Sequence, residues 1–151
     1  MKLVHTARLT VYCKDGEACE EIKACLQGLV PLDLEQEKLA VKETIMKGEH
    51  AAEQDIKIYE IMLSKERHVN KFLAALNQKL SKEQRELLVQ QAASRFDEDL
   101  NFFIRLDKDK LMHENLCQLT DSGECFHIKL SIAAYPKRYD TALAAVKSIF
   151  S

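Results

Sequence analysis

Hydrophobic and polar side chains alternate from His5 to Cys13, which predicts a β-strand with one face in the core and one face in water. The water-facing side of this strand carries Arg8, Thr10 and Tyr12. Asp15 then stands where a helix N-cap would, and apolar residues at helical spacing predict a helix over 18–29 that ends before Pro31. The N-terminal part of the chain is therefore predicted to be a strand followed by a helix.

The same two periods divide the rest of the chain. A polar turn around Gly48 separates two strands, and Ser64 is the predicted N-cap of the helix that follows. Ser81 and Gln84 have the spacing of a capping box, which predicts the start of a second helix. The predicted strands cover 39–46, 55–63, 100–107, 116–119 and 125–134, and the predicted helices cover 64–80, 81–96 and 139–150.

The strand over 55–63 changes phase. Ile56 and Ile58 share one of its faces, whereas the apolar side chains of Tyr59, Ile61 and Leu63 share the other. A bulge, or burial on both faces, would produce this pattern.

The order of elements is β-α-β-β-α-α-β-β-β-α. Helices that cluster between runs of strands, with short hairpins, are typical of an α+β domain. We expect a single domain over 1–151, with a mostly antiparallel sheet, helices packed on one face and the other face partly open to water.

Composition limits the function. The chain has 151 residues, of which 46% are hydrophobic and 30% charged, as in ordinary folded proteins. Its formal net charge is −2, which argues against binding to nucleic acid or membranes by bulk charge. Any anion site must therefore be a local patch. No apolar run approaches the roughly 20 residues that span a bilayer.

The cysteines indicate the redox compartment. There are 5, an odd number, without a CxxC pair, and the first ten residues lack the apolar core of a signal peptide. We expect a reduced, cytoplasmic protein with free thiols.

The sequence lacks the usual signatures of catalysis and metal binding. No two histidines are spaced i, i+4, and there is no nucleophile elbow and no glycine-rich phosphate loop. We therefore expect no metal, no cofactor and no enzymatic activity. An enzyme could still assemble its site from distant residues such as His113, Asp107 and Cys117, in a deep pocket with perturbed ionisable groups.

The candidate binding surface is the water-facing side of the predicted sheet. It combines cations, hydroxyls and an aromatic ring, which are the groups that hold the phosphates, 2′-hydroxyls and bases of RNA. An ordinary solvated sheet face with cross-strand charge pairs shows the same alternation, so both interpretations stay open. Besides the three residues of the first strand, its members are Lys42, Thr44, Arg105, Asp107, His127, Lys129 and Ser131.

The densest charge runs from Arg105 to Lys110, where a predicted strand ends. One interpretation is a polar strand exit. The other is a phosphate site in which Asp107 orients Arg105. In that site Lys108 and Lys110 would contribute further positive charge.

Residues 96–108 resemble the central signature of an archaeal family of RNA-binding, predicted exosome-associated proteins, in which an acidic turn leads into a strand ending in Arg-Leu-Asp-Lys. Segments 15–21, 47–50 and 133–137 are similar to other parts of that family, in the same order. Each motif is short, so the specificity comes from their co-linear order. The chain departs from the family pattern at 109–112, and in the turn after Gly48 it lacks a second glycine, an asparagine and a proline.

The resemblance implies a fold similar to that of ribosomal protein L-five and a role in RNA binding, with association with RNA processing or the exosome. We therefore expect a non-catalytic RNA-binding protein, a divergent member of the family. The alternative is an interaction or scaffold module that dimerises or docks through a sheet edge or the C-terminal helix. The expected RNA-contacting residues are Arg105, Lys108, Lys110, Arg8, Tyr12 and Lys129.

Overall fold

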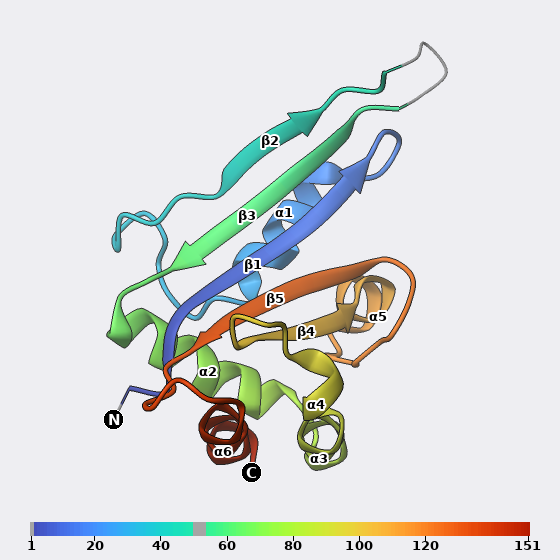
Figure 1. Cartoon of the computed structure of the whole chain (residues 1–151). Coiled ribbons are helices and arrows are strands. Elements are labelled where there is room, and N and C mark those ends of the chain that lie inside the picture. The colour runs from blue at the N-terminus through green and yellow to red at the C-terminus, as the bar shows by residue number, and fades with distance from the viewer. Residues whose placement is uncertain (1, 50–53) are drawn as a thin grey trace.

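The computed structural model describes residues 2–49 and 54–151. Its strands form one antiparallel sheet in the order β2-β3-β1-β5-β4 (Figure 1). The strands are β1 (Val4–Lys14), β2 (Lys42–Met46), β3 (Ile56–Leu63), β4 (Asn101–Asp107) and β5 (Cys125–Ile132). The helices are α1 (Cys19–Gly28), α2 (Glu66–Lys79), α3 (Lys82–Gln90), α4 (Ala92–Arg95), α5 (Lys108–Glu114) and α6 (Tyr139–Phe150). The predicted α+β class and antiparallel sheet are confirmed.

The helices form a layer on one face of this sheet, and we call the other face the open face (Figure 1). Helices α1 and α2 pack on β1, and α6 packs on β5. The core lies between the two layers, because one side of each alternating strand turns toward the helices. Its largest fully buried side chains include Leu9, Leu26, Tyr59, Phe72, Phe102, Phe126 and Phe150.

Strand β3 has the change of phase noted in the sequence of 55–63, and it contains no bulge. Its pairing is continuous with β1 on one side and with β2 on the other. Tyr59, Ile61 and Leu63 point into the core, whereas Ile56 and Ile58 lie half-buried on the open face. The phase change therefore comes from apolar side chains on both faces of β3, fully buried on the helix side and half-buried on the open side, which is closer to the second of the two sequence explanations.

Two predicted helix caps are wrong. Helix α1 has Ala18 as its N-cap, without a side-chain hydrogen bond, because the chain first turns at Gly16, whose φ is +88°. Asp15 lies within that turn. Helix α2 has Lys65 as its N-cap rather than Ser64.

The predicted capping box is half formed. The Ser81 hydroxyl accepts a hydrogen bond from the backbone N–H of Gln84 at 3.1 Å. The Gln84 side chain does not return to Ser81 but accepts from the backbone N–H of Leu119 at 2.7 Å. The predicted helix over 81–96 is divided at Gln91 into α3 and α4, and the predicted strand over 116–119 is reduced to a single bridge between Leu119 and Leu106.

The expectation that all the thiols are free is wrong for two of them. Cys13 at the end of β1 and Cys19 at the start of α1 form a disulfide, with their Cα atoms 5.7 Å apart. The tight turn between strand and helix brings them together, and the number of cysteines and the absence of a CxxC pair do not reveal such a contact. Cys25, Cys117 and Cys125 are free, and burial raises the pKa of each thiol.

Among the described residues, no helix is long and apolar enough to cross a membrane. The turn after Gly48, which the resemblance had singled out, is only partly described. The Gly48 backbone N–H donates to Asp55 at 3.1 Å, but His50 and residues 51–53 lie outside the described residues.

Candidate nucleic-acid interface

The pairing registers place the polar side chains of the open face in rows that cross the sheet. One row contains Arg105 on β4, His127 on β5, Thr10 on β1, Glu60 on β3 and Lys42 on β2. The neighbouring row contains Phe103, Lys129, Arg8 and Met62. These two rows hold four cations and one carboxylate, so the structure brings Arg8, Lys42, Arg105 and Lys129 to one face of the sheet, as the strand alternation predicts.

Arg8 and Lys129 are direct cross-strand partners on β1 and β5. Like charges in this position repel each other and destabilise a sheet. Groups near Arg8 and Lys129 should therefore offset the repulsion between them. The Arg8 Nε atom lies 3.7 Å from the Glu60 carboxylate, and the Lys129 ammonium lies 6.0 Å from the centre of the Phe103 ring. One carboxylate and one ring therefore partly offset the charge of these two side chains.

The Arg105 side chain is exposed and makes no hydrogen bond or ion pair within 2–49 and 54–151. Its positive charge nevertheless acts on its neighbour His127: burial, and then the Arg105 charge, hold the pKa of that imidazole below its ordinary value. Arg105 is thus a cation whose charge is available at the open face.

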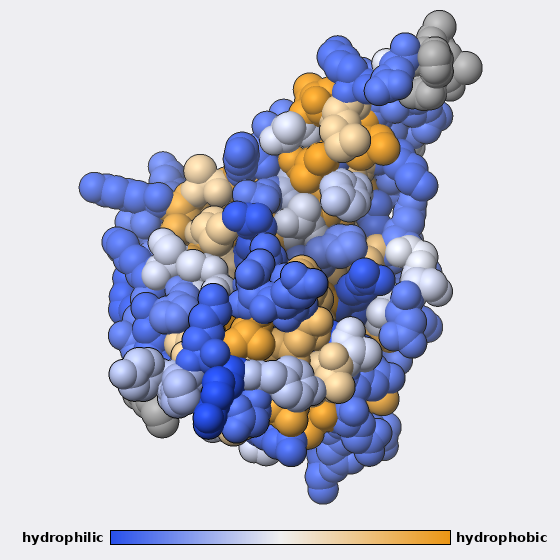
Figure 2. Space-filling model, in the orientation of Figure 1, coloured by the Kyte–Doolittle hydropathy of each residue, from blue (hydrophilic) through white to orange (hydrophobic). Residues whose placement is uncertain are grey.

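Tyr12 supplies an aromatic surface beside these cations. Its side chain is 46% exposed, and its ring contacts the edge of the His127 ring with centroids 5.7 Å apart. Figure 2 shows this face with polar residues over the β1, β5 and β4 region, and a hydrophobic group near the tip of β2 and β3. Met46, Ile56 and Ile58 lie in that second region.

Lys108 does not lie on the open face. It is 6% exposed, and its ammonium donates to the Tyr12 carbonyl at 2.9 Å and to the Glu17 carboxylate at 3.0 Å. A second carboxylate, that of Glu124, lies 3.7 Å away and also pairs with Lys14 at 2.8 Å. These four charges neutralise one another, so the ammonium of Lys108 is occupied inside the protein.

The other charges near the end of β4 are also used locally. The Asp107 carboxylate accepts a hydrogen bond from the backbone N–H of Lys110 at 2.9 Å and caps α5. It therefore does not orient Arg105, contrary to the sequence interpretation. The Lys110 ammonium pairs with Glu114 one turn further along α5, at 3.0 Å, which raises the Lys110 pKa. Of the three cations in the run from 105 to 110, Arg105 is the one without an ion-pair partner in the described part of the chain.

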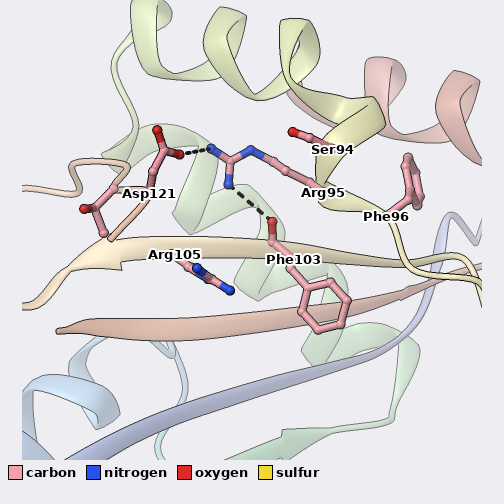
Figure 3. A pocket seen from close by; sticks show the side chains of 7 residues that line it. Ser94, Arg95, Phe96, Phe103, Arg105 and Asp121 are labelled. Atoms are coloured by element: carbon pink, nitrogen blue, oxygen red, sulfur yellow. Dashed lines mark hydrogen bonds and ion pairs between the residues drawn. The ribbon is translucent and has the colours of Figure 1, made fainter. Parts of the chain in front are cut away.

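A pocket of about 210 Å³ lies at the outer edge of β4 (Figure 3). We call it the edge pocket. It brings together two guanidinium groups, two hydroxyls, two aromatic rings and one carboxylate. They belong to Arg95, Arg105, Ser94, Thr120, Phe96, Phe103 and Asp121.

Arg95 was missed by the sequence analysis. It is 9% exposed, and its guanidinium donates to the Gln91 side chain at 2.6 Å and to the Phe103 carbonyl at 3.5 Å. A signal was present, since Arg95 continues the apolar stripe of Leu88 and Ala92 at helical spacing. An arginine on such a stripe is unusual, because burying its charge costs free energy unless it is paired.

The three residues of the alternative enzyme site have other surroundings in the structure. The His113 ring contacts Asp109 at 2.7 Å, Asp107 caps α5, and Cys117 is buried in the core. A thiol–imidazole contact of 3.4 Å does occur between Cys125 and His127. Burial raises the pKa of this thiol and lowers that of the imidazole, so it favours the neutral form of both groups and works against activation of the thiol. The described residues contain no group of three or more side chains suited to a metal ion.

Comparison with known proteins shows the family to which this chain belongs. A family model described as RNA binding matches residues 6–133, which is most of the chain. The chain belongs to this RNA-binding family. The RNA-binding protein PAB1135 of Pyrococcus abyssi is 24% identical over 143 residues, which cover 95% of this chain and 91% of that protein.

Solved structures similar to this member of the RNA-binding family share its fold. Protein AF2318 from Archaeglobus fulgidus has a TM-score of 0.83 at 22% identity, covering 97% of this chain and 99% of the other. Mth689 from Methanothermobacter thermautotrophicus has a TM-score of 0.77 at 21% identity, covering 99% and 100%. Both are described as DUF54 proteins. The likeness extends over the whole fold, including the sheet that carries the open face.

Proposed function

We propose that this protein binds RNA, without catalysing a reaction on it, through the part of the open face formed by β4, β5 and β1. The observation that carries the proposal is the cross-strand pair of like charges, Arg8 opposite Lys129, with unpaired Arg105 in the next row. A polyanion that lies across these strands would remove the repulsion. The name of the family and that of its Pyrococcus abyssi relative support RNA as that polyanion.

The proposed roles differ among the sequence-predicted residues. Arg8, Arg105 and Lys129 contact phosphates, and Tyr12 stacks on a base, since an exposed aromatic ring on a sheet suits an unpaired base. Lys108 has a supporting role, because it holds the backbone at Tyr12. Lys110 stays outside the proposed contact set, because it is paired within α5.

The experiment is a titration of labelled single-stranded and double-stranded RNA, at two or more salt concentrations, with a variant that carries Arg8→Gln and Lys129→Gln. Each lost phosphate contact should lower the salt slope by about 0.7 for a single strand and about 0.9 for a duplex. The matched control carries Lys71→Gln and Lys147→Gln, which remove two exposed charges from α2 and α6 in the helix layer. Equal RNA affinity and slope in both double variants would refute the proposed surface.

The same variant separates binding from folding. Relief of the repulsion between Arg8 and Lys129 should offset the loss of the long contact to Glu60, so we expect thermal stability within a few degrees of wild type.

Finer expectations of the sequence analysis form part of this proposal. Association with the exosome or with other RNA-processing proteins, a cytoplasmic location and a fold relationship to ribosomal protein L-five rest on the resemblance. Co-purification of exosome subunits with the tagged protein, sensitive to RNase or not, would test the first of these.

A second candidate function, docking to another protein, is favoured by Ile45 and Met46 on β2, which are 48% and 55% exposed. Such side chains at a sheet edge can pair with another chain. A concentration-dependent mass in analytical ultracentrifugation that Met46→Lys abolishes would support docking between copies.

A further inference from the structure

The edge pocket combines features that point to an anionic ligand. Arg95 is 9% exposed and the nearest carboxylate, that of Asp121, lies 4.0 Å away on a side chain that is 86% exposed. The Nε atom of Arg95 is buried and has no hydrogen-bond partner within the described residues. A buried guanidinium is normally held by a close, hydrogen-bonded carboxylate, and here that partner is distant and solvated.

A second guanidinium adds to this imbalance. Arg105 lines the same pocket and makes no ion pair within the described part of the chain. Burial lowers the pKa of Arg95, Asp121 acts in the opposite direction, and the Arg105 charge lowers it again. The two arginines therefore repel each other across the pocket, and one exposed carboxylate does not neutralise them.

We propose that the edge pocket binds a phosphate group of RNA between the guanidinium groups of Arg95 and Arg105. Guanidinium groups match the geometry of phosphate oxygens and bind them with paired hydrogen bonds. The hydroxyls of Ser94 and Thr120 are further donors at the wall of the pocket. Figure 3 shows Arg95 extending from α4 toward the Phe103 carbonyl, and Arg105 lying against β4 on the other side of its ribbon.

The size of the pocket limits what it holds. Its volume of about 210 Å³ is smaller than the roughly 300–1,000 Å³ of typical small-molecule sites, so a phosphate with part of its sugar fits better than a whole cofactor. Because Arg105 belongs to both the pocket and the open face, an RNA strand on the open face reaches the pocket at β4. The inference rests on the proposed function for the source of the phosphate.

Asp121 provides a test in which binding should improve. Its carboxylate competes with the ligand for Arg95, so Asp121→Asn should tighten phosphate binding by about two- to fivefold. Arg105→Gln should weaken it about tenfold, through the loss of a charged hydrogen bond. Both residues are exposed, so these variants should fold. Glu66→Gln in α2 removes an exposed carboxylate elsewhere and serves as the matched control.

The first measurement is an NMR titration with inorganic phosphate, against sodium chloride at equal ionic strength. The Nε–H signals of Arg95 and Arg105 should shift saturably with phosphate only. Arg95→Lys keeps the charge but loses the fork of donors and should weaken the effect. Equal shifts with chloride, or unchanged phosphate affinity in both Asp121→Asn and Arg105→Gln, would overturn the proposal.

The second measurement uses three single-stranded RNAs of one sequence, which carry a 5′-phosphate, a 3′-phosphate or hydroxyls at both ends. A preference for a phosphorylated end that Arg105→Gln removes identifies a terminal phosphate as the ligand. Equal affinities that Arg105→Gln and Arg95→Lys both lower identify a phosphate within the strand. Phosphate binding without RNA binding would contradict the proposed function and leave a site for free phosphate. RNA binding that Arg8→Gln with Lys129→Gln weakens, but that Arg95→Lys and Asp121→Asn leave unchanged, would contradict the pocket and leave the proposed function standing.

Discussion

Arg105 and Lys108 carry the same charge and lie three residues apart, yet their surroundings are opposite. Arg105 is exposed at the open face and has no ion-pair partner within 2–49 and 54–151. Lys108 is 6% exposed and is held by the Tyr12 carbonyl and the Glu17 carboxylate. Between them the chain leaves β4 and enters α5. A dense run of charge in the sequence therefore does not become a dense patch on the surface when it spans the end of a strand.

The change of period explains the difference. Along β4, alternate residues face water, so Arg105 follows Phe103 onto the open face. From residue 108 the helical period applies, and Lys108 turns back over the sheet end toward carboxylates that come from distant parts of the chain. The comparison predicts that Lys108 serves folding and Arg105 serves binding.

The largest effect is expected for Lys108→Met. This change leaves the Tyr12 carbonyl and the Glu17 carboxylate without their donor, and we expect a loss of about 2 kcal/mol in the free energy of unfolding. Arg105→Met should change it by less than about 0.5 kcal/mol. Urea denaturation measures both, and equal losses would show that the two residues do not divide the roles in this way.

RNA binding should show the reverse order. Arg105→Met is expected to lower the slope of log affinity against log salt by about 0.7–0.9, because one phosphate contact is lost. The folded fraction of Lys108→Met should keep the wild-type slope, since its ammonium is occupied inside the protein. A reduced slope for Lys108→Met and a normal one for Arg105→Met would reverse the assignment.

The free charge of Arg105 should also be detectable at His127. Burial and then Arg105 hold the pKa of His127 below its ordinary value of 6.5. The unfolded chain takes up this proton more readily, so the folded state should lose stability as the pH falls from about 6.5 through the folded pKa. In Arg105→Met we expect the His127 pKa to rise and this loss to shrink. An NMR pH titration measures the pKa, and an unchanged value would mean that the Arg105 charge is screened.

Lys110→Ala should have the smallest effect. It removes an exposed i, i+4 ion pair with Glu114, which is worth about 0.3–0.5 kcal/mol. We expect RNA affinity and its salt slope to stay as in wild type. A lower slope would return Lys110 to the contact surface, as the sequence analysis had it.

Strand alternation made much of this surface predictable. The faces of Arg8, Tyr12, Arg105 and Lys129 follow from a period of two, because all four lie in regularly paired parts of the sheet, beyond the register shift between Val4 and Thr6. The α+β class and the order of the main elements followed from the same patterns.

The features that could not be predicted lie where one strand or helix ends and the next begins. The turn at Gly16 delays α1 and brings two cysteines together, and the break at Gln91 directs Arg95 to the edge of β4. The partners of Lys108 are distant in sequence, since Glu17 is 91 residues away. Contacts of this kind depend on how the elements pack, which no local pattern records.

The two edge strands of the sheet, β4 and β2, differ in whether their outer backbone groups have hydrogen-bond partners. On β4, the Phe103 carbonyl accepts a hydrogen bond from the Arg95 guanidinium, and the Arg105 carbonyl accepts one from the Thr120 backbone N–H. On β2, whose residues 42–46 are all exposed, the described residues provide no such cover. Lateral extension of the sheet by another chain would therefore proceed from β2 alone. Any oligomer built in that way would leave the edge pocket at the far border accessible in every copy.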